Sequence, residues 1–204
     1  MLFLIIMSCS AGRPPALCSA AVVKLVKEFF CFEAVNELSV KEFPSYDDRN
    51  FYFRGTLDTV THAAHSADGM EAANSATPHA QPKLEGEYVL KLNNPLFASY
   101  EVLLGINSLL NHLHANGCTR CIRPLVGRAG ADVLEITKEK LMDYESNSDL
   151  IEKITESKFF MRVMTFIPGE CLDTVDKHHL TPRLLYDVGN CVGSACAILQ
   201  VRVN

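Results

Sequence analysis

Several features that define large classes of protein are missing from this chain of 204 residues. No apolar run approaches the roughly 20 residues that a membrane-spanning helix needs. No stripe of Lys and Arg is present on a chain with a formal net charge of -5, which argues against nucleic acid as the main partner. The apolar run 2–7 followed by small residues faintly resembles a secretory signal, but it is short and has no Lys or Arg before it, so an irregular N-terminus is the better interpretation. We therefore expect neither membrane nor nucleic-acid partners, and an irregular N-terminus over residues 1–18.

The composition is that of a globular protein with a buried core. Apolar residues make up 48% of the chain and charged residues 21%. Several of the eight cysteines fall inside apolar helical stretches, where a reduced thiol packs like a small hydrophobic side chain. A secreted disulfide scaffold would be shorter and richer in loops. These features favour a reducing compartment, and we expect a cytoplasmic location.

The hydrophobic pattern predicts an α+β domain with a mainly antiparallel, five-stranded sheet and one packed helix. We expect helices at 19–32 and 98–115, with Gly117 just beyond the end of the second. Thr181 is a good N-cap for a third helix over 182–200, with Pro182 in its first turn. The strands are expected at 35–43, from 51 onward, 87–92, 133–137 and 158–166. The segment 56–83 has no apolar period and is interpreted as a flexible insertion.

Two charged residues are the first candidates for chemistry. Lys91 lies inside an apolar strand, and Glu101 lies in the first turn of the next helix. A strand lysine can hold nucleotide phosphates while a helix glutamate orients it by ion pairing. Strand lysines also occur at exposed sheet edges without any such role. The pair therefore needs support from the segments around it.

Two other segments supply that support. The turn 44–50 between the first two strands is rich in groups that could cover phosphates, although no Gly lies between Pro44 and Phe53, unlike the glycine-rich loop of protein kinases. Thr165, Phe166 and Ile167 end the last strand before Pro168 and Gly169. Backbone groups at this strand end could pair with the edge of a base. The alternative interpretation is that the first segment is an ordinary hairpin turn and the second an ordinary strand end, with no role in binding.

These segments resemble the aminoglycoside-phosphotransferase family of small-molecule kinases, in particular its hydroxylysine kinases. The resemblance runs from about residue 22 to residue 200, with the insertion after Gly55 as its main departure. It is carried by four strings: Phe43-Pro44-Ser45-Tyr46-Asp47-Asp48-Arg49-Asn50-Phe51, Tyr88-Val89-Leu90-Lys91, Phe166-Ile167-Pro168-Gly169 and Leu184-Leu185-Tyr186-Asp187-Val188-Gly189. The first string is the specific one, whereas Val-Leu-Lys occurs widely.

The resemblance implies a protein-kinase-like N-lobe over 19–166, followed by a hinge and the first helix of a helical C-lobe over 167–204. The implied reaction is phosphoryl transfer from GTP or ATP, with Mg²⁺, to the hydroxyl of 5-hydroxy-L-lysine or a similar amino alcohol. Lys91 would hold phosphates and Glu101 would orient Lys91. The residues that would close over the nucleotide are Ser45, Tyr46, Asp47 and Asn50. The base would meet Thr165, Phe166 and Ile167.

The family's catalytic loop has no counterpart in the sequence. Phosphoryl transfer needs a carboxylate for the attacking hydroxyl and Asn and Asp ligands for Mg²⁺. No His here is followed two residues on by Asp, and Asp187-Val188-Gly189 is expected in mid-helix rather than in a metal-binding loop. We therefore expect a truncated N-terminal part with no catalytic residue and no activity alone. The alternative is a non-catalytic isoform that binds nucleotide, or a protein partner through helix 182–200.

Cysteine and histidine residues offer a weaker, third reading. His112, His114, Cys118 and Cys121 are zinc-ligand types at close spacing, and the two cysteines could instead form a redox pair. However, histidines two residues apart on a helix point in different directions. The histidines at 62, 65 and 79 lie in the insertion without cysteine or carboxylate neighbours. Ordinary thiols and solvated histidines are the better interpretation.

Overall fold

The computed structural model describes residues 14–58, 84–145, 155–169 and 181–200. Its elements, in chain order, are α1 (Ser19–Phe29), β1 (Phe32–Phe43), β2 (Arg49–Leu57), β3 (Leu84–Asn93), α3 (Tyr100–Ala115), β4 (Leu134–Thr137), α4 (Lys138–Met142), β5 (Lys158–Thr165) and α6 (Pro182–Gln200). The predicted helices and strands are all present, although α1 ends at Phe29 and not at residue 32, because Phe32 already belongs to β1. Only α4 was not predicted, because its five residues are too few to show a helical period.

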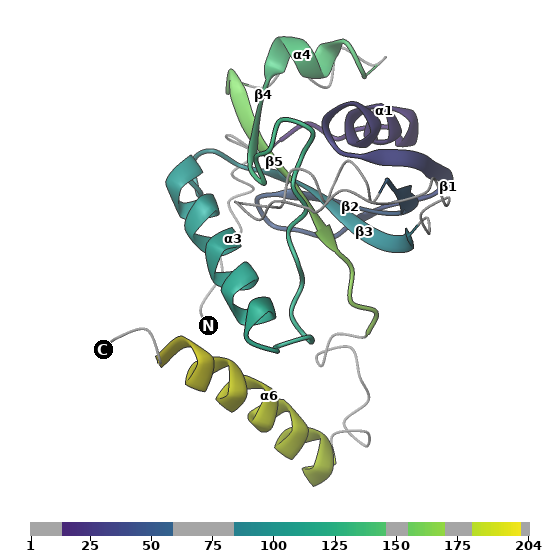
Figure 1. Cartoon of the computed structure of the whole chain (residues 1–204). Helices are drawn as coiled ribbons and strands as arrows, with labels where there is room; N and C mark the ends of the chain where they lie inside the picture. Colours follow the sequence, from purple (N-terminus) through teal and green to yellow (C-terminus); the bar gives the residue numbers. More distant parts are fainter. Residues whose placement is uncertain (1–13, 59–83, 146–154, 170–180, 201–204) are drawn as a thin grey trace, which may run out of the picture.

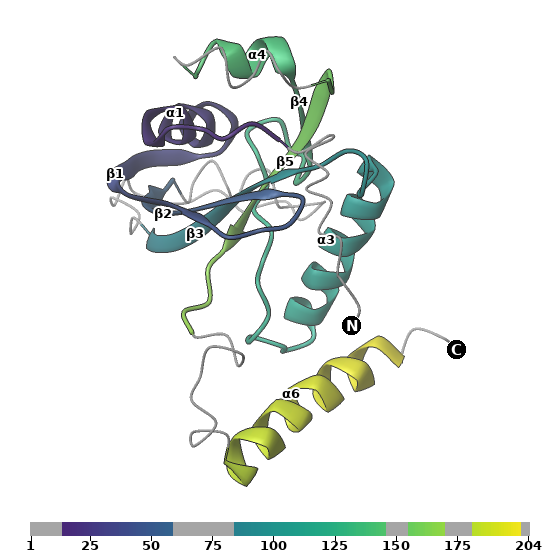
Figure 2. The ribbon, with the colours of Figure 1, turned by 180° about the vertical axis from the view of Figure 1, so that it is seen from behind.

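The five strands form one sheet in the order β1-β2-β3-β5-β4, and every neighbouring pair is antiparallel. Figures 1 and 2 show α1 and α3 on opposite sides of this sheet, with α6 below α3 and apart from the strands. The prediction of an α+β fold with a five-stranded antiparallel sheet is therefore confirmed. The arrangement is consistent with a kinase-like N-lobe.

The larger hydrophobic core lies between the sheet and α1. Successive strand residues point to opposite faces, and the alternate residues Phe51, Phe53, Leu90 and Leu92 are buried on the α1 side. The helix contributes its own buried stripe: Ala21, Val22, Leu25 and Val26. α4 joins this side of the molecule through an ion pair of 3.2 Å between Lys140 Nζ and Glu28 Oε1.

The opposite face of the sheet carries a smaller core beneath α3. Leu103 of this helix packs with Phe160 of β5 and with Val133. The helix begins at Ser99, whose hydroxyl accepts a hydrogen bond from the Val102 amide. It ends before Gly117, whose φ of 88° is the left-handed conformation that glycine adopts most easily. Polar side chains occupy the centre of this face, beside this small core.

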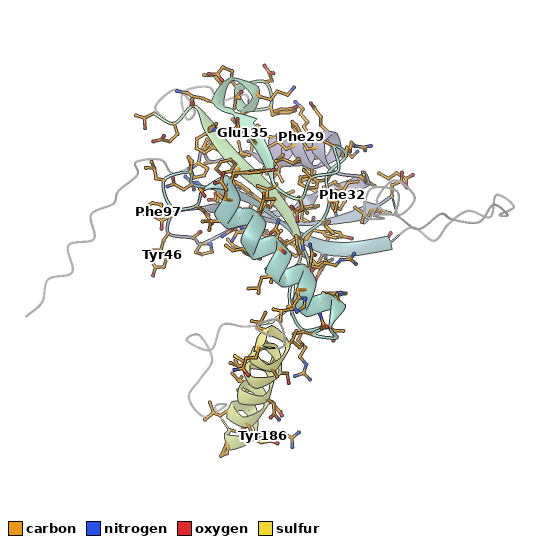
Figure 3. All side chains as sticks on the ribbon, turned by 60° about the vertical axis from the view of Figure 1, so that its left-hand side comes forward. Phe29, Phe32, Tyr46, Phe97, Glu135 and Tyr186 are labelled. Atoms are coloured by element: carbon orange, nitrogen blue, oxygen red, sulfur yellow. The ribbon has the colours of Figure 1, made fainter. Side chains whose placement is uncertain are left out.

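α6 begins as predicted, since the Thr181 hydroxyl accepts a hydrogen bond of 3.2 Å from the Leu184 amide. None of its residues is buried, and Tyr186 lies on an exposed surface of the helix (Figure 3). Asp187 lies in mid-helix and pairs with Arg183 at 3.1 Å, as expected for a solvent-facing side chain. Within the described ranges, no helix is both long and apolar enough to span a membrane.

The predicted insertion begins slightly later than expected. Residues 56 and 57 still belong to β2, where they pair with β3 in regular register. The reason is that Thr56 and Leu57 continue the strand alternation, with Leu57 buried in the larger core. Residues 59–83, with the histidines at 62, 65 and 79, lie outside the described residues.

Candidate functional site

Three polar side chains form a row across the centre of the sheet. Asn50 of β2 is the register partner of Lys91 of β3, and Lys91 is the partner of Arg162 of β5. Directly opposed residues in antiparallel strands have their side chains on the same face. Leu90 and Leu92, on either side of Lys91, are buried in the α1 core, so the row lies on the α3 face. The fold thus places two cations next to each other on a rigid surface.

The Lys91 ammonium is half-buried and faces a carboxylate. Its Nζ atom lies 3.8 Å from Asp48 Oδ2, and the lysine side chain is 27% exposed. Burial lowers the pKa of Lys91, Asp48 opposes this by attracting the charged form, and the neighbouring Arg162 cation lowers the pKa further. Lys91 is therefore shielded from bulk water, whereas a lysine on an exposed sheet edge would be fully solvated.

Asp48 is fixed by donors from the end of β3. Its Oδ2 atom accepts a hydrogen bond of 2.8 Å from Asn93 Nδ2, and its Oδ1 atom accepts one of 3.0 Å from the Asn94 amide. These contacts join the turn between β1 and β2 to β3. The carboxylate consequently stands at a defined place beside Lys91 instead of moving with a loose turn.

Arg162 is the more deeply buried cation, with only 4% of the residue exposed. Its Nε atom donates to Asn93 Oδ1 at 3.0 Å, and its Nη1 atom donates to Asn107 Oδ1 of α3 at 2.9 Å. Asn107 in turn donates to the Asp132 carbonyl at 3.1 Å. Burial lowers the pKa of Arg162, and the carboxylates of Asp48 and Asp132 oppose this. The side-chain partners at hydrogen-bonding distance are neutral amides.

These groups line a cavity of about 460 Å³ between the sheet, α3 and the turn after β1. Its apolar wall comes from α3 and from Phe97, Ala98, Ile122 and Met164, and its polar wall comes from Lys91, Asn93, Arg162 and the turn. Tyr46 and Phe97 lie at the same edge of the molecule, near the start of α3 (Figure 3), and are 97% and 62% exposed. Two cations, Lys91 and Arg162, and two carboxylates, Asp47 and Asp48, line the cavity. The contacts of Arg162 at hydrogen-bonding distance go to neutral amides, so this cation is placed to pair with a bound anion.

The structure gathers most of the predicted phosphate-side residues around this cavity. Ser45, Tyr46 and Asp47 line it together with Lys91. Asn50 lies next to Lys91 in the row, and its Oδ1 atom is buried without a hydrogen-bond partner among the described residues.

Glu101 lies elsewhere. The ion pair of Lys91 goes to Asp48, whereas Glu101 is exposed in the first turn of α3. There its own backbone amide, the Ser99 side chain and the Lys158 cation lower its pKa. Glu101 therefore stabilises the helix start through local contacts, and Asp48 holds the position beside Lys91 that we expected Glu101 to take.

The predicted base-contacting residues continue β5 at the edge of the row. The Phe166 amide donates to the Glu87 carbonyl at 2.8 Å, and the Thr165 amide donates to the Arg123 carbonyl at 2.9 Å. The Phe166 ring packs against Phe43 and Tyr52, with centroid distances of 5.8 and 5.0 Å. Backbone groups of successive residues point to opposite sides of a strand. Because the Phe166 amide faces β3, the backbone N–H and C=O groups of Thr165 and Ile167 point away from β3. Ile167 is itself 44% exposed.

Sequence reasoning missed four members of this site: Asp48 as the partner of Lys91, and Asn93, Asn107 and Arg162. A signal existed for Arg162, because it is a charge inside the apolar strand Lys158–Thr165, as Lys91 is in β3. Asp48 lay within the string that carried the family resemblance. No sequence signal identifies Asn107, which differs from other helix amides only in its burial.

A metal site at the cysteines is not supported where the structure can be described. No group of three His, Cys, Asp or Glu side chains among the described residues is placed to hold a metal ion. Cys118 and Cys121 are free thiols, and the Cys121 thiol donates to the Cys118 carbonyl at 2.9 Å. Burial and the neighbouring Cys118 raise the pKa of Cys121, which disfavours the thiolate that binds zinc.

Comparison with known proteins gives a distant likeness. No family model matches the chain. A hydroxylysine kinase from Xenopus laevis is 27% identical over 179 residues, which cover 87% of this chain and 37% of that protein. The chain thus spans a little over a third of the length of the relative it matches. The likeness supports a kinase-like relationship.

Proposed function

We propose that this chain is the nucleotide-holding part of a small-molecule kinase, and that its cavity takes the phosphates of GTP or ATP. The observation that carries the proposal is the half-buried Lys91 ammonium, held 3.8 Å from Asp48 at the wall of a cavity that also contains Arg162. A rigid cation on a central strand is what phosphate binding requires. The distant likeness to a hydroxylysine kinase points to the same chemistry.

In this proposal the remaining parts of a nucleotide have places along the same face of the sheet. Ser45, Tyr46 and Asp47 close over the phosphates, and Asn50 offers a side-chain amide beside Lys91. The base lies near the end of β5, where the backbone of Ile167 pairs with it and the rings around Phe166 provide an apolar support. The Thr165 amide, which we expected to meet the base, instead donates to the Arg123 carbonyl. Asp48 takes the orienting role toward Lys91.

The acceptor that we propose is the hydroxyl of 5-hydroxy-L-lysine or a similar amino alcohol, by analogy with the relative. The 204-residue chain contains no His-x-Asp sequence, and no cluster of metal ligands occurs in its described part. The ligands of Mg²⁺ and the carboxylate that orients the attacking hydroxyl would therefore come from other residues of a complete kinase. We expect this chain to bind nucleotide and not to turn over by itself.

Titration with fluorescent GTP and ATP analogues tests the binding step. The wild-type chain should bind one nucleotide, and Lys91→Met should weaken binding at least tenfold, because a charge-assisted contact to phosphate is lost. Lys24→Met is the matched control, since Lys24 is exposed on α1 at the other face of the sheet. Equal binding by both variants would contradict the proposed site.

A kinase assay tests the second part. The pure chain with GTP, Mg²⁺ and 5-hydroxylysine should form no phosphohydroxylysine, because a positioned base and metal ligands supply most of the catalysis in phosphoryl transfer. Product formation above the uncatalysed level would show that this chain contains catalytic groups that we have not recognised.

A further inference from the structure

We propose that Arg162 is a second phosphate-binding cation, and that together with Lys91 it makes the cavity selective for ligands with two or more linked phosphates. This inference rests on the proposed nucleotide-binding function and deepens it. Neither the sequence resemblance nor the relative assigned a role to Arg162. Three features point to this role: the neighbouring positions of the two cations on the sheet, the neutral partners of Arg162 and the fixed orientation of its guanidinium.

The spacing follows from the sheet register. Lys91 and Arg162 are direct cross-strand partners, which places their Cβ atoms about 5 Å apart on one face. Two long side chains that start from neighbouring positions on one face can direct their cationic groups to different phosphoryl groups of a diphosphate or triphosphate. A single phosphate satisfies one of them well and leaves the other with a poor contact. The row on the sheet thus favours phosphate chains over single phosphates.

The Arg162 guanidinium has no carboxylate at hydrogen-bonding distance among the described residues. Asp48 is the carboxylate at ion-pair distance from Lys91, and its oxygens are also used by Asn93 and the Asn94 amide. The close partners of Arg162 are the neutral oxygens of Asn93 and Asn107. Hydrogen bonds to neutral amides orient a buried cation but do not neutralise it. A bound polyanion supplies Arg162 with a charged acceptor in direct contact.

The guanidinium is also held ready for a ligand. Asn93 fixes Nε from β3, and Asn107 fixes Nη1 from α3. An arginine has five N–H donors in a planar fork, and these described contacts use Nε and Nη1. Nη2 and the second Nη1 proton are then the donors for phosphate oxygens. Because the side chain is already ordered, binding costs little further conformational entropy.

The first experiment uses the unmodified chain. Inorganic phosphate, pyrophosphate and tripolyphosphate compete with a fluorescent GTP analogue in the absence of Mg²⁺, with citrate as a control for anionic charge alone. Pyrophosphate and tripolyphosphate should displace the analogue at concentrations at least tenfold lower than phosphate or citrate do, as expected for one additional charge-assisted contact. Equal potency of phosphate and pyrophosphate would overturn the proposal.

The second experiment removes the cation. Arg162→Gln should reduce the ratio of GTP to GMP affinity at least tenfold while GMP affinity changes little, and Arg162→Lys should retain part of the ratio. Arg120→Gln, in the exposed turn after α3, is the control and should retain the full ratio. An unchanged ratio in folded Arg162→Gln that still binds GTP overturns this inference alone. A wild-type chain that binds no nucleotide overturns the proposed function and this inference with it. If Arg162→Gln does not fold, the polyphosphate series decides.

Discussion

Replacing Asp48 by asparagine should destabilise the fold by about 3 kcal/mol, because the two cations lose their shared counter-charge. Asp48→Asn keeps one oxygen but places an NH₂ group against the Asn93 or Asn94 donor, which costs about 1–2 kcal/mol. Loss of the ion pair to Lys91 adds about 1–2 kcal/mol, between the values for exposed and buried pairs. Both of its side chains are about one-quarter exposed, at 27% and 24%.

Chemical and thermal unfolding followed by circular dichroism would measure this loss. For a chain of this size, about 3 kcal/mol corresponds to a fall in Tm of roughly 6–12 °C. Asp47→Asn makes the same change of charge one residue earlier in the turn and should cost less than about 0.5 kcal/mol. The comparison separates the specific contacts of Asp48 from the general effect of removing an acidic residue.

A double-mutant cycle then tests the electrostatic cause. If the uncompensated Lys91 charge is what destabilises Asp48→Asn, Lys91→Met should recover about 1–2 kcal/mol in the Asp48→Asn background. Millimolar pyrophosphate should also raise the Tm of Asp48→Asn more than that of the wild type, since the anion replaces the carboxylate. Additive single effects, or an Asp48→Asn variant as stable as Asp47→Asn, would refute this reasoning.

The Lys91–Arg162 network and α6 lead to four further predictions. Nucleotide affinity should fall as the pH rises through the lowered pKa of Lys91, below its ordinary value of 10.5, and calorimetry in that range should detect proton uptake on binding. In the same range the unfolded chain holds the Lys91 proton more tightly than the folded one, so this residue's contribution to the unfolding free energy rises with pH, and Lys91→Met should remove the rise. Asn107→Ala should lower the free energy of unfolding by about 2–3 kcal/mol, because Arg162 Nη1 loses its acceptor in a buried site and α3 loses its link to β5. The control is Asn111→Ala, which removes an exposed amide of the same helix and should change the unfolding midpoint little. Thr181→Ala should lower the helix content of α6 measured by circular dichroism, because the N-cap contributes about 1 kcal/mol to helix stability. Thr181→Ser keeps the hydroxyl and should keep the helix content. Equal circular dichroism of both variants would contradict the capping role.

Local rules were sufficient to predict most of the fold. The helix 182–200 could be placed from Thr181 and Pro182, because capping depends on residues within one turn. The strand around Lys91 could be placed because apolar, β-branched and aromatic residues surround a single charge. The short helix α4 was missed because five residues with one buried leucine, Leu141, carry no period.

The site itself could be predicted only in part, since its contacts join distant segments. Lys91 was identified from its strand, but its partner Asp48 lies 43 positions earlier, and only the strand register brings them together. Glu101 has the residue type and the helix position expected of an orienting carboxylate, yet its local contacts keep it at the exposed helix start. Arg162 and Asn107 are 55 residues apart, and no local pattern links them.

The cross-strand row has a consequence for how the sheet must assemble. Side-chain direction alternates at every strand residue, so a slip of β3 by one position would exchange Lys91 for Leu90 or Leu92. An ammonium group would then enter the phenylalanine-rich layer beneath α1, and a leucine would take its place against Arg162 and Asp48. A misaligned pairing of β3 is therefore less stable than the native register, because it buries an unpaired charge. The same groups that we expect to hold the ligand thus help to specify the register of the sheet.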